Sequence, residues 1–139
     1  ALPPIAWGGT AISVRLPRVQ RLTLDRWGLD GATLTVLRAA LVDRRTVLFT
    51  GATGSGKTTL MAAWLSDALA SDRIVIIEDV AEAPISHPHL VALECRQPNM
   101  EGAGGVDLAR LVREALRMRP DRLVVGEGRG AEIRECLGA

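Results

Sequence analysis

The segment that most constrains this chain is a glycine-rich stretch at residues 51–58, which reads Gly-Ala-Thr-Gly-Ser-Gly-Lys-Thr and matches the pattern GxxxxGK[ST] in full. Glycines let the backbone turn tightly and bring several N–H groups toward one point, where an anion can bind. The stretch follows an apolar, β-rich run at 46–50 and precedes a helical apolar pattern that starts near Lys57. A helix that begins there adds its positive N-terminal end. We therefore predict a phosphate-binding loop, called the phosphate loop below, between a strand and a helix.

The polar positions of this loop suit a nucleotide bound with Mg²⁺. Lys57 supplies a mobile cation for the β- and γ-phosphates, and the hydroxyl of Thr58 completes the Mg²⁺ shell. A glycine-rich turn without a ligand is the other interpretation, but average residue usage gives a full match by accident in roughly one chain of this length in a few hundred. The residues expected to contact the nucleotide are Gly51, Ala52, Thr53, Gly54, Ser55, Gly56, Lys57, Thr58 and Thr59.

The hydrophobic pattern of the chain predicts an α/β fold. Several short runs are apolar throughout, and such strands must be covered on both faces, as in a parallel sheet flanked by helices. Other segments carry apolar residues at helical spacing, and Pro120 ends the last of them. Strands are predicted at 11–16, 46–50, 74–77, 90–93 and 122–125, and helices at 31–42, 57–69 and 107–118.

The composition excludes several classes of protein. Of the 139 residues, 47% are apolar and 24% charged, which is typical of a chain that folds as one domain. A net charge of +1 and an aromatic content of 3% argue against a nucleic-acid coat or a base-stacking surface. No apolar run reaches the roughly 18 residues of a membrane span. Cys95 and Cys136 form no CxxC pattern, so we expect no disulfide scaffold and a cytosolic location.

Acidic residues follow two of the predicted strands. Glu78 and Asp79 come directly after the run at 74–77, and Glu127 follows the run at 122–125. Ligands bind at the carboxyl ends of strands in an open parallel sheet. Mg²⁺ needs carboxylates there, directly or through water, and hydrolysis needs a base to orient the attacking water. We expect Glu78 and Glu127 to serve these needs, whereas Asp79 has the alternative role of capping the next turn.

Taken in order, these segments resemble the ATPases of type II and type IV secretion systems, and within them the Tad/Flp-pilus type. Chance does not plausibly produce so many of the family's segments in the same order along the chain. Residues 51–59 look like the family's Walker A segment, and residues 76–82 are similar to its acidic Asp box. The stretch that follows the Asp box resembles residues 87–89 and 93–96, and the family's helix and Walker B strand resemble residues 111–127. Residues 2–5 and 12–15 look like the end of the family's N-terminal domain and its linker.

The resemblance implies a RecA-like P-loop ATPase domain at 22–139, preceded at 1–21 by the end of an N-terminal domain and a linker. The family continues beyond Ala139 into a His box, so we expect a core that is incomplete at both ends. Such ATPases bind ATP with Mg²⁺ and work as homohexamers on the cytoplasmic face of the inner membrane, against a membrane platform protein, to drive pilus assembly or protein export. By this resemblance Glu78 is the catalytic base, and Glu127 with Thr58 holds Mg²⁺ or its waters.

Some basic residues have more than one interpretation. Arg129 contacts the γ-phosphate or a neighbouring subunit, or else forms a structural salt bridge, and Gly128 before it replaces the family's usual apolar residue. Arg15 is a candidate nucleotide contact from the linker. His87 and His89 are interpreted as loop residues rather than metal ligands. Trp64 is expected in the core. Five arginines lie in or just after the helix predicted at 107–118: Arg110, Arg113, Arg117, Arg119 and Arg122. We expect most of them on the polar face of this helix, exposed to solvent or to a neighbouring subunit, rather than in a nucleic-acid-binding surface.

Three functions compete with a secretion motor. The first is a chain that binds nucleotide without turning it over. The second is a small-molecule kinase, which needs an acceptor pocket and a lid, and no basic lid segment follows the helix at 107–118. The third is a RecA-type nucleic-acid motor, which needs basic or aromatic loops that the composition disfavours.

Overall fold

The computed structural model describes residues 23–126. The predictions made for the strand at 11–16, for Arg15 and for Glu127, Arg129 and Cys136 lie outside this range, as does the proposed domain boundary near residue 21. The elements in chain order are the 3₁₀ helix η1 (Leu24–Trp27), α1 (Gly31–Val42), α2 (Lys57–Ser66), β1 (Ile74–Glu78), β2 (Leu90–Glu94), α3 (Leu108–Arg117) and β3 (Arg122–Val125).

The sheet confirms the predicted parallel α/β arrangement. Its strand order is β2-β1-β3, and both pairings of the central strand β1 are parallel. In register, Ile76 lies opposite Ala92 of β2 and Val124 of β3. All five residues of β1 are buried, because each edge is occupied by a neighbour and each face by a helix.

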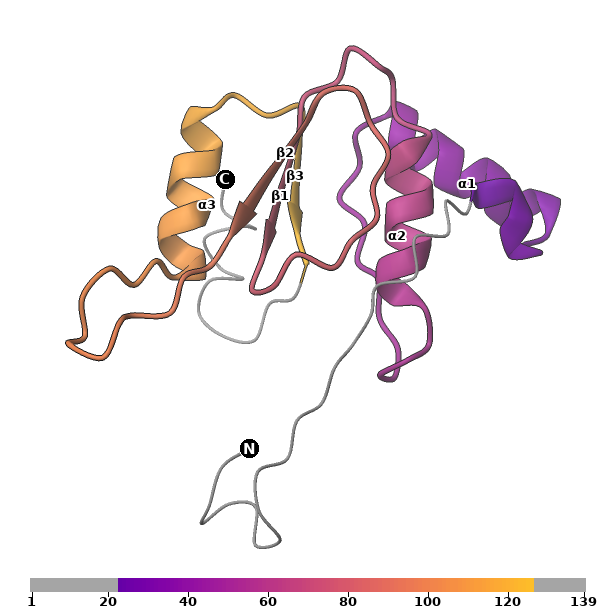
Figure 1. Ribbon diagram of the computed structural model, residues 1–139. Coiled ribbons are helices and arrows are strands. Elements are labelled where there is room, and N and C mark those ends of the chain that lie inside the picture. The colour runs from indigo at the N-terminus through magenta and orange to yellow at the C-terminus, as the bar shows by residue number, and fades with distance from the viewer. Residues whose placement is uncertain (1–22, 127–139) are drawn as a thin grey trace, which may run out of the picture.

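Alternate residues of β1 pack into two separate cores. Figure 1 shows α2 on one side of the sheet and α3 on the other. Ile74 and Ile76 belong to the cluster that includes Trp64 of α2, whereas Val75 and Ile77 pack with Val112 of α3. Successive side chains of a strand point to opposite faces, so an unbroken apolar run satisfies both cores at once.

Helix α2 is buried on nearly all sides, and its residues 61–65 are all in the core. Trp64 is 6% exposed, its Nε1 donates a hydrogen bond of 2.7 Å to the carbonyl of Leu37 in α1, and its ring lies 5.7 Å from that of Phe49. The predicted core role of Trp64 is therefore confirmed. The predicted extension of this helix to residue 69 is wrong: α2 ends at Ser66, and Leu69 is 62% exposed. Bonds from the N–H of residues 67 and 68 to the carbonyls three positions back close the last turn.

The prediction of a strand at 46–50 is also wrong, although alternate residues of this segment are partly buried, as its apolar pattern indicates. Val47 and Phe49 are half-buried against the core cluster of α2, while Leu48 is 83% exposed and Thr50 is exposed. A strand needs a partner backbone, and the described sheet consists of β2, β1 and β3, none of which pairs with this segment. Within residues 23–126, the segment at 46–50 consequently joins no ladder.

Helix α3 forms as predicted. The Asp107 side chain accepts a hydrogen bond of 2.8 Å from the Arg110 N–H and caps its start, and the helix ends before Pro120. Four of the five arginines grouped with it are exposed, as expected of a polar face: Arg110, Arg113, Arg117 and Arg119. Arg122 differs, because it begins β3 and is only 9% exposed.

Arg122 is held in a buried ion network at the amino end of the sheet. Its guanidinium bonds Asp72 at 2.7 and 3.0 Å and donates at 2.6 Å to the carbonyl of Leu41, in the last turn of α1. Arg44 also reaches Asp72, at 3.1 Å, and binds Asp121 at 2.9 Å. The network ties the end of α1 to β3 and so fixes where the chain turns toward the phosphate loop. None of the helices within 23–126 is long and apolar enough to span a bilayer.

Candidate nucleotide-binding site

The phosphate loop connects the extended segment at 46–50 to the start of α2, at the end of the sheet toward which the strands run (Figure 1). Gly56 precedes the helix with φ +92°, a left-handed conformation that glycine adopts without a Cβ penalty. A Cβ at Gly56 would also lie 2.9 Å from the ring of Trp27. Glycine at position 56 is thus required by backbone conformation and by space, and the N–H groups at the start of α2 stay open to an anion.

Lys57 folds back over the beginning of the loop. Its Nζ donates hydrogen bonds of 2.9 Å to the carbonyls of Gly51 and Ala52. An ammonium group has three donors, so these bonds hold the cation in the loop and leave one donor for another acceptor. Thr58 and Thr59 follow in the first turn of α2 and are half-buried. The structure therefore brings a cation, a hydroxyl and a helix N-terminus to one place.

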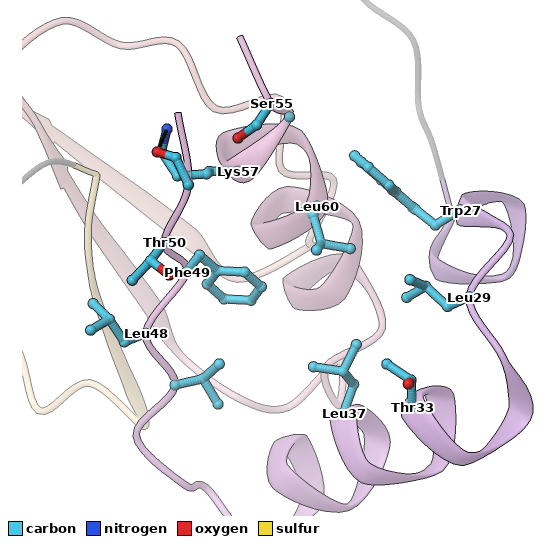
Figure 2. A pocket seen from close by; sticks show the side chains of 13 residues that line it. Trp27, Leu29, Thr33, Leu37, Leu48, Phe49, Thr50, Ser55, Lys57 and Leu60 are labelled. Atoms are coloured by element: carbon cyan, nitrogen blue, oxygen red, sulfur yellow. Dashed lines mark hydrogen bonds between the residues drawn. The ribbon is translucent and has the colours of Figure 1, made fainter. Parts of the chain in front are cut away.

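A pocket of about 480 Å³ lies beside the phosphate loop. Figure 2 shows Trp27, Leu37, Phe49 and Leu60 around it, with Lys57 at its upper end. The buried Nε1 of Trp27 has no hydrogen-bond partner within the part of the chain that the structure describes. The pocket thus combines apolar side chains with polar groups of the phosphate loop, among them Ser55 and Lys57.

Glu78 is the last residue of β1 and is 6% exposed. Its Oε1 accepts hydrogen bonds from the N–H of Glu82, at 3.2 Å, and of Ala83, at 3.0 Å. The Glu78 carbonyl accepts from the N–H of Cys95 at 3.0 Å, which fixes the backbone against the end of β2. The carboxylate therefore lies at the carboxyl end of the central strand, as predicted, and also closes the turn that follows it.

The end of β3 lies directly against Glu78. The Gly126 N–H donates a hydrogen bond of 2.8 Å to the carbonyl of Ile77, and a Cβ at Gly126 would lie 2.8 Å from Cγ of Glu78. Gly126 immediately precedes Glu127, which is outside the described residues. The structure thus brings Glu78 together with the residue before Glu127, and it leaves the positions of Glu127 and Arg129 as predictions.

The other polar residues near the strand ends have structural partners. Asp79 is exposed and lies near the Cys95 thiol. Partial burial of the thiol, followed by the hydrogen bond to Asp79 and the negative charge of Asp79, raises the pKa of Cys95 to about 11. The thiol is therefore protonated at neutral pH. His87 accepts from the His89 N–H at 3.2 Å through Nδ1 and bonds the Leu69 carbonyl at 2.9 Å through Nε2. Over residues 23–126 no three His, Cys, Asp or Glu side chains gather as a metal site. A phosphate-bound Mg²⁺ needs only one or two protein ligands.

Sequence reasoning did not anticipate two residues of this site. Trp27 packs on the phosphate loop from η1, and Gly126, the residue after β3, packs on Glu78. Both contacts join positions far apart in the chain, and neither residue stands in a pattern that predicts its partner. For Gly126, the available signal is the Gly-Glu pair at 126–127, which marks the end of the strand without indicating which residue lies against it.

Comparison with known proteins gives the family. A family model described as type II/IV secretion system protein matches residues 1–139. A Mycobacterium tuberculosis protein named for conjugal transfer is 47% identical over 142 residues, which cover 99% of this chain and 40% of that protein. Conjugal transfer protein TrbB of Rhizobium radiobacter is 36% identical over 145 residues, covering 99% of this chain and 42% of TrbB.

Solved structures agree with this family. The crystal structure of the VirB11 ATPase from the Brucella suis type IV secretion system, in complex with sulphate, matches with a TM-score of 0.66 and 36% identity. The match covers 78% of this chain and 30% of that one, so the chain spans less than half the length of these relatives. The predicted α/β fold and the predicted family are confirmed: the chain belongs to the type II/IV secretion system protein family.

Proposed function

We propose that this chain is the ATP-binding and ATP-hydrolysing part of a motor that energises type IV secretion or a related pilus system. The observation that carries the proposal is the placement of Lys57, whose ammonium is held by the Gly51 and Ala52 carbonyls beside the N-terminus of α2. The neighbouring pocket of about 480 Å³ supplies room for the nucleoside. The relatives support it, since one is the ATPase of a type IV secretion system and others are named for conjugal transfer.

Each residue of the site has a proposed task. The backbone N–H groups of residues 51–59 and the Lys57 ammonium bind the phosphates, while Thr58 and Glu127 hold Mg²⁺ directly or through water. Mg²⁺, when bound with ATP, neutralises charge on the β- and γ-phosphates. Arg129 contacts the γ-phosphate. The assignments within 51–59 rest on the loop geometry, and those of Glu127 and Arg129 rest on the resemblance to the family's motifs.

Glu78 is the proposed general base. Hydrolysis forms a bond between a water oxygen and the γ-phosphorus, breaks the bond from that phosphorus to the bridging oxygen, and releases one proton from the water. Glu78 is buried at the strand end, and only its Oε1 bonds the turn at residues 82–83. Oε2 makes neither contact and is the oxygen that we assign to the attacking water.

The assembly and its setting follow from the family as further proposals. We assign 1–21 to the end of an N-terminal domain with its linker and 22–139 to the ATPase domain. The intact protein acts as a homohexamer at the inner face of the cytoplasmic membrane, against a membrane platform protein. The Tad/Flp-pilus subtype remains our prediction from the motifs, and the relatives named above belong to conjugal transfer and VirB11 systems.

The test is Mg²⁺-dependent phosphate release by the intact protein. Wild type should release phosphate from ATP and stop when EDTA removes the metal. Thr58→Val keeps the shape of the side chain but removes its hydroxyl, so it should need more Mg²⁺ for the same rate. Thr35→Val is the matched control, since its hydroxyl only bonds the Gly31 carbonyl within α1. A wild-type protein that binds ATP without phosphate release would favour the non-hydrolysing alternative.

A further inference from the structure

We propose that Gly126 is a positioning residue for Glu78: it has no Cβ because the space that a Cβ needs is filled by the glutamate side chain. The inference rests on the catalytic role proposed for Glu78. It assigns to Gly126 a task separate from that of Glu127, which follows it in the chain.

Space, rather than backbone conformation, is what requires glycine here. Gly126 is not among the residues with positive φ, so its backbone is one that other residues adopt. A Cβ built at position 126 would meet Cγ of Glu78 at 2.8 Å, Oε1 of Glu78 at 3.4 Å and the Ile77 carbonyl oxygen at 3.5 Å. Only the first distance is one that real Cβ atoms essentially never show, so the conflict is with the glutamate side chain.

Hydrogen bonds oppose a movement of either backbone that would relieve this conflict. The Gly126 N–H is bonded to the Ile77 carbonyl at 2.8 Å, and the ladder pairs Ile77 with Val125. On the other side of β1, the Glu78 carbonyl accepts from the Cys95 N–H. Both backbones are therefore tied to a neighbouring strand at this point, and we expect the side chain of Glu78 to be the part that shifts.

A shift of that side chain removes its anchor. Oε1 of Glu78 is held by two N–H groups, those of Glu82 and Ala83, and displacing Cγ lengthens both hydrogen bonds. A misplacement of a reacting group by about 1 Å can lower a rate about 10²-fold. Phosphate binding uses the loop at 51–58, whereas the three atoms nearest to a Cβ at position 126 belong to Glu78 and Ile77, so binding and turnover should separate.

The experiment compares Gly126→Ala with Gly31→Ala in the intact protein. Gly31 is the matched control because its added Cβ would meet nothing within 4 Å and its φ is ordinary. Calorimetric titration with a non-hydrolysable ATP analogue gives the fraction of competent sites, and phosphate release is expressed per competent site. For Gly126→Ala we expect turnover to fall at least about tenfold while the analogue Kd stays within about threefold of wild type.

A second pair of variants tests the contact itself. Glu78→Ala removes the atoms that meet the new Cβ, so Gly126→Ala should lower the urea midpoint in the wild-type background and not in the Glu78→Ala background. If Gly126→Ala alone does not fold, the double variant should fold. Equal destabilisation in both backgrounds, an unfolded double variant, or wild-type turnover in Gly126→Ala would overturn the inference. Absence of phosphate release from wild type would instead overturn the proposed function.

Discussion

The guanidinium of Arg122 donates two hydrogen bonds to a single oxygen of Asp72, at 2.7 and 3.0 Å, and both side chains are buried. The pair lies where β3 begins, and the Gly126–Glu78 contact lies where β3 ends. One strand therefore joins a buried ion pair to the proposed catalytic carboxylate. We therefore expect changes at Asp72, near the start of β3, to lower the free energy of unfolding. Changes at Glu78, near the end of β3, should instead lower turnover.

Asp72→Ala should destabilise the protein strongly. It leaves the guanidinium of Arg122 buried without its carboxylate, and breaking a buried pair costs about 3–5 kcal/mol. Asp25→Ala, which removes an exposed pair with Arg38, should cost at most about 1 kcal/mol. Urea unfolding of both variants measures the difference. Similar small losses would show that Asp72 does not compensate the buried charge.

Acidification should weaken the same end of the sheet. The hydrogen bond from the Arg73 N–H, followed by the charge of Arg44, lowers the pKa of Asp121 below its ordinary 3.8. A carboxylate whose pKa is lower when folded contributes stability above its unfolded pKa and loses that contribution as the pH falls through the folded pKa. The stability difference between wild type and Asp121→Asn should thus be full above about pH 4 and shrink below it. A difference that is unchanged from pH 6 to pH 2.5 in urea titrations would contradict this sign.

Trp27 should report nucleotide binding. Its ring lies against Gly56, whereas Trp64 is enclosed in the core and bonded to the Leu37 carbonyl. Adding an ATP analogue should change the tryptophan emission, and Trp27→Phe should lose most of that change. Trp64→Phe is the comparison and should keep it. If the two variants give equal signals, the ligand does not disturb the Trp27–Gly56 contact.

The proposed carboxylate roles predict two different defects. Glu78→Gln keeps the shape but not the basicity, so turnover should fall about 10²–10⁴-fold with analogue affinity unchanged. Glu127→Gln should chiefly raise the Mg²⁺ concentration needed for half-maximal rate. Phosphate release across a Mg²⁺ titration distinguishes them. A large Mg²⁺ shift for Glu78→Gln alone would mean that the two roles are exchanged.

Much of this fold could be predicted because its signals are local. The phosphate loop is one continuous segment, and the run at 74–77 is apolar throughout because its two faces meet α2 and α3. The helix at 31–42 was predicted with the bounds that the structure has. Even Glu78 could be placed, since a residue that directly follows a buried strand lies at a known end of a parallel sheet.

The remainder depends on which segments meet. The run at 46–50 has the residues of a strand, but a ladder needs a partner that composition does not specify. Arg122 resembles its exposed neighbours in sequence, but it is buried where its guanidinium meets Asp72, 50 positions earlier, and the carbonyl of Leu41. Gly126 and Trp27 likewise owe their roles to contacts with Glu78 and Gly56. Such pairings emerge from tertiary packing, which local propensity does not determine.

The most direct test of the central claim is the affinity of the Lys57→Ala variant for a Mg²⁺–ATP analogue. The phosphate loop without its cation faces several negative oxygens, so calorimetric titration should show most of the affinity lost. Arg117→Ala, an exposed cation on α3, serves as the charge-matched control and should bind as wild type does. Equal affinities for wild type, Lys57→Ala and Arg117→Ala would contradict the assignment of this loop as the nucleotide site.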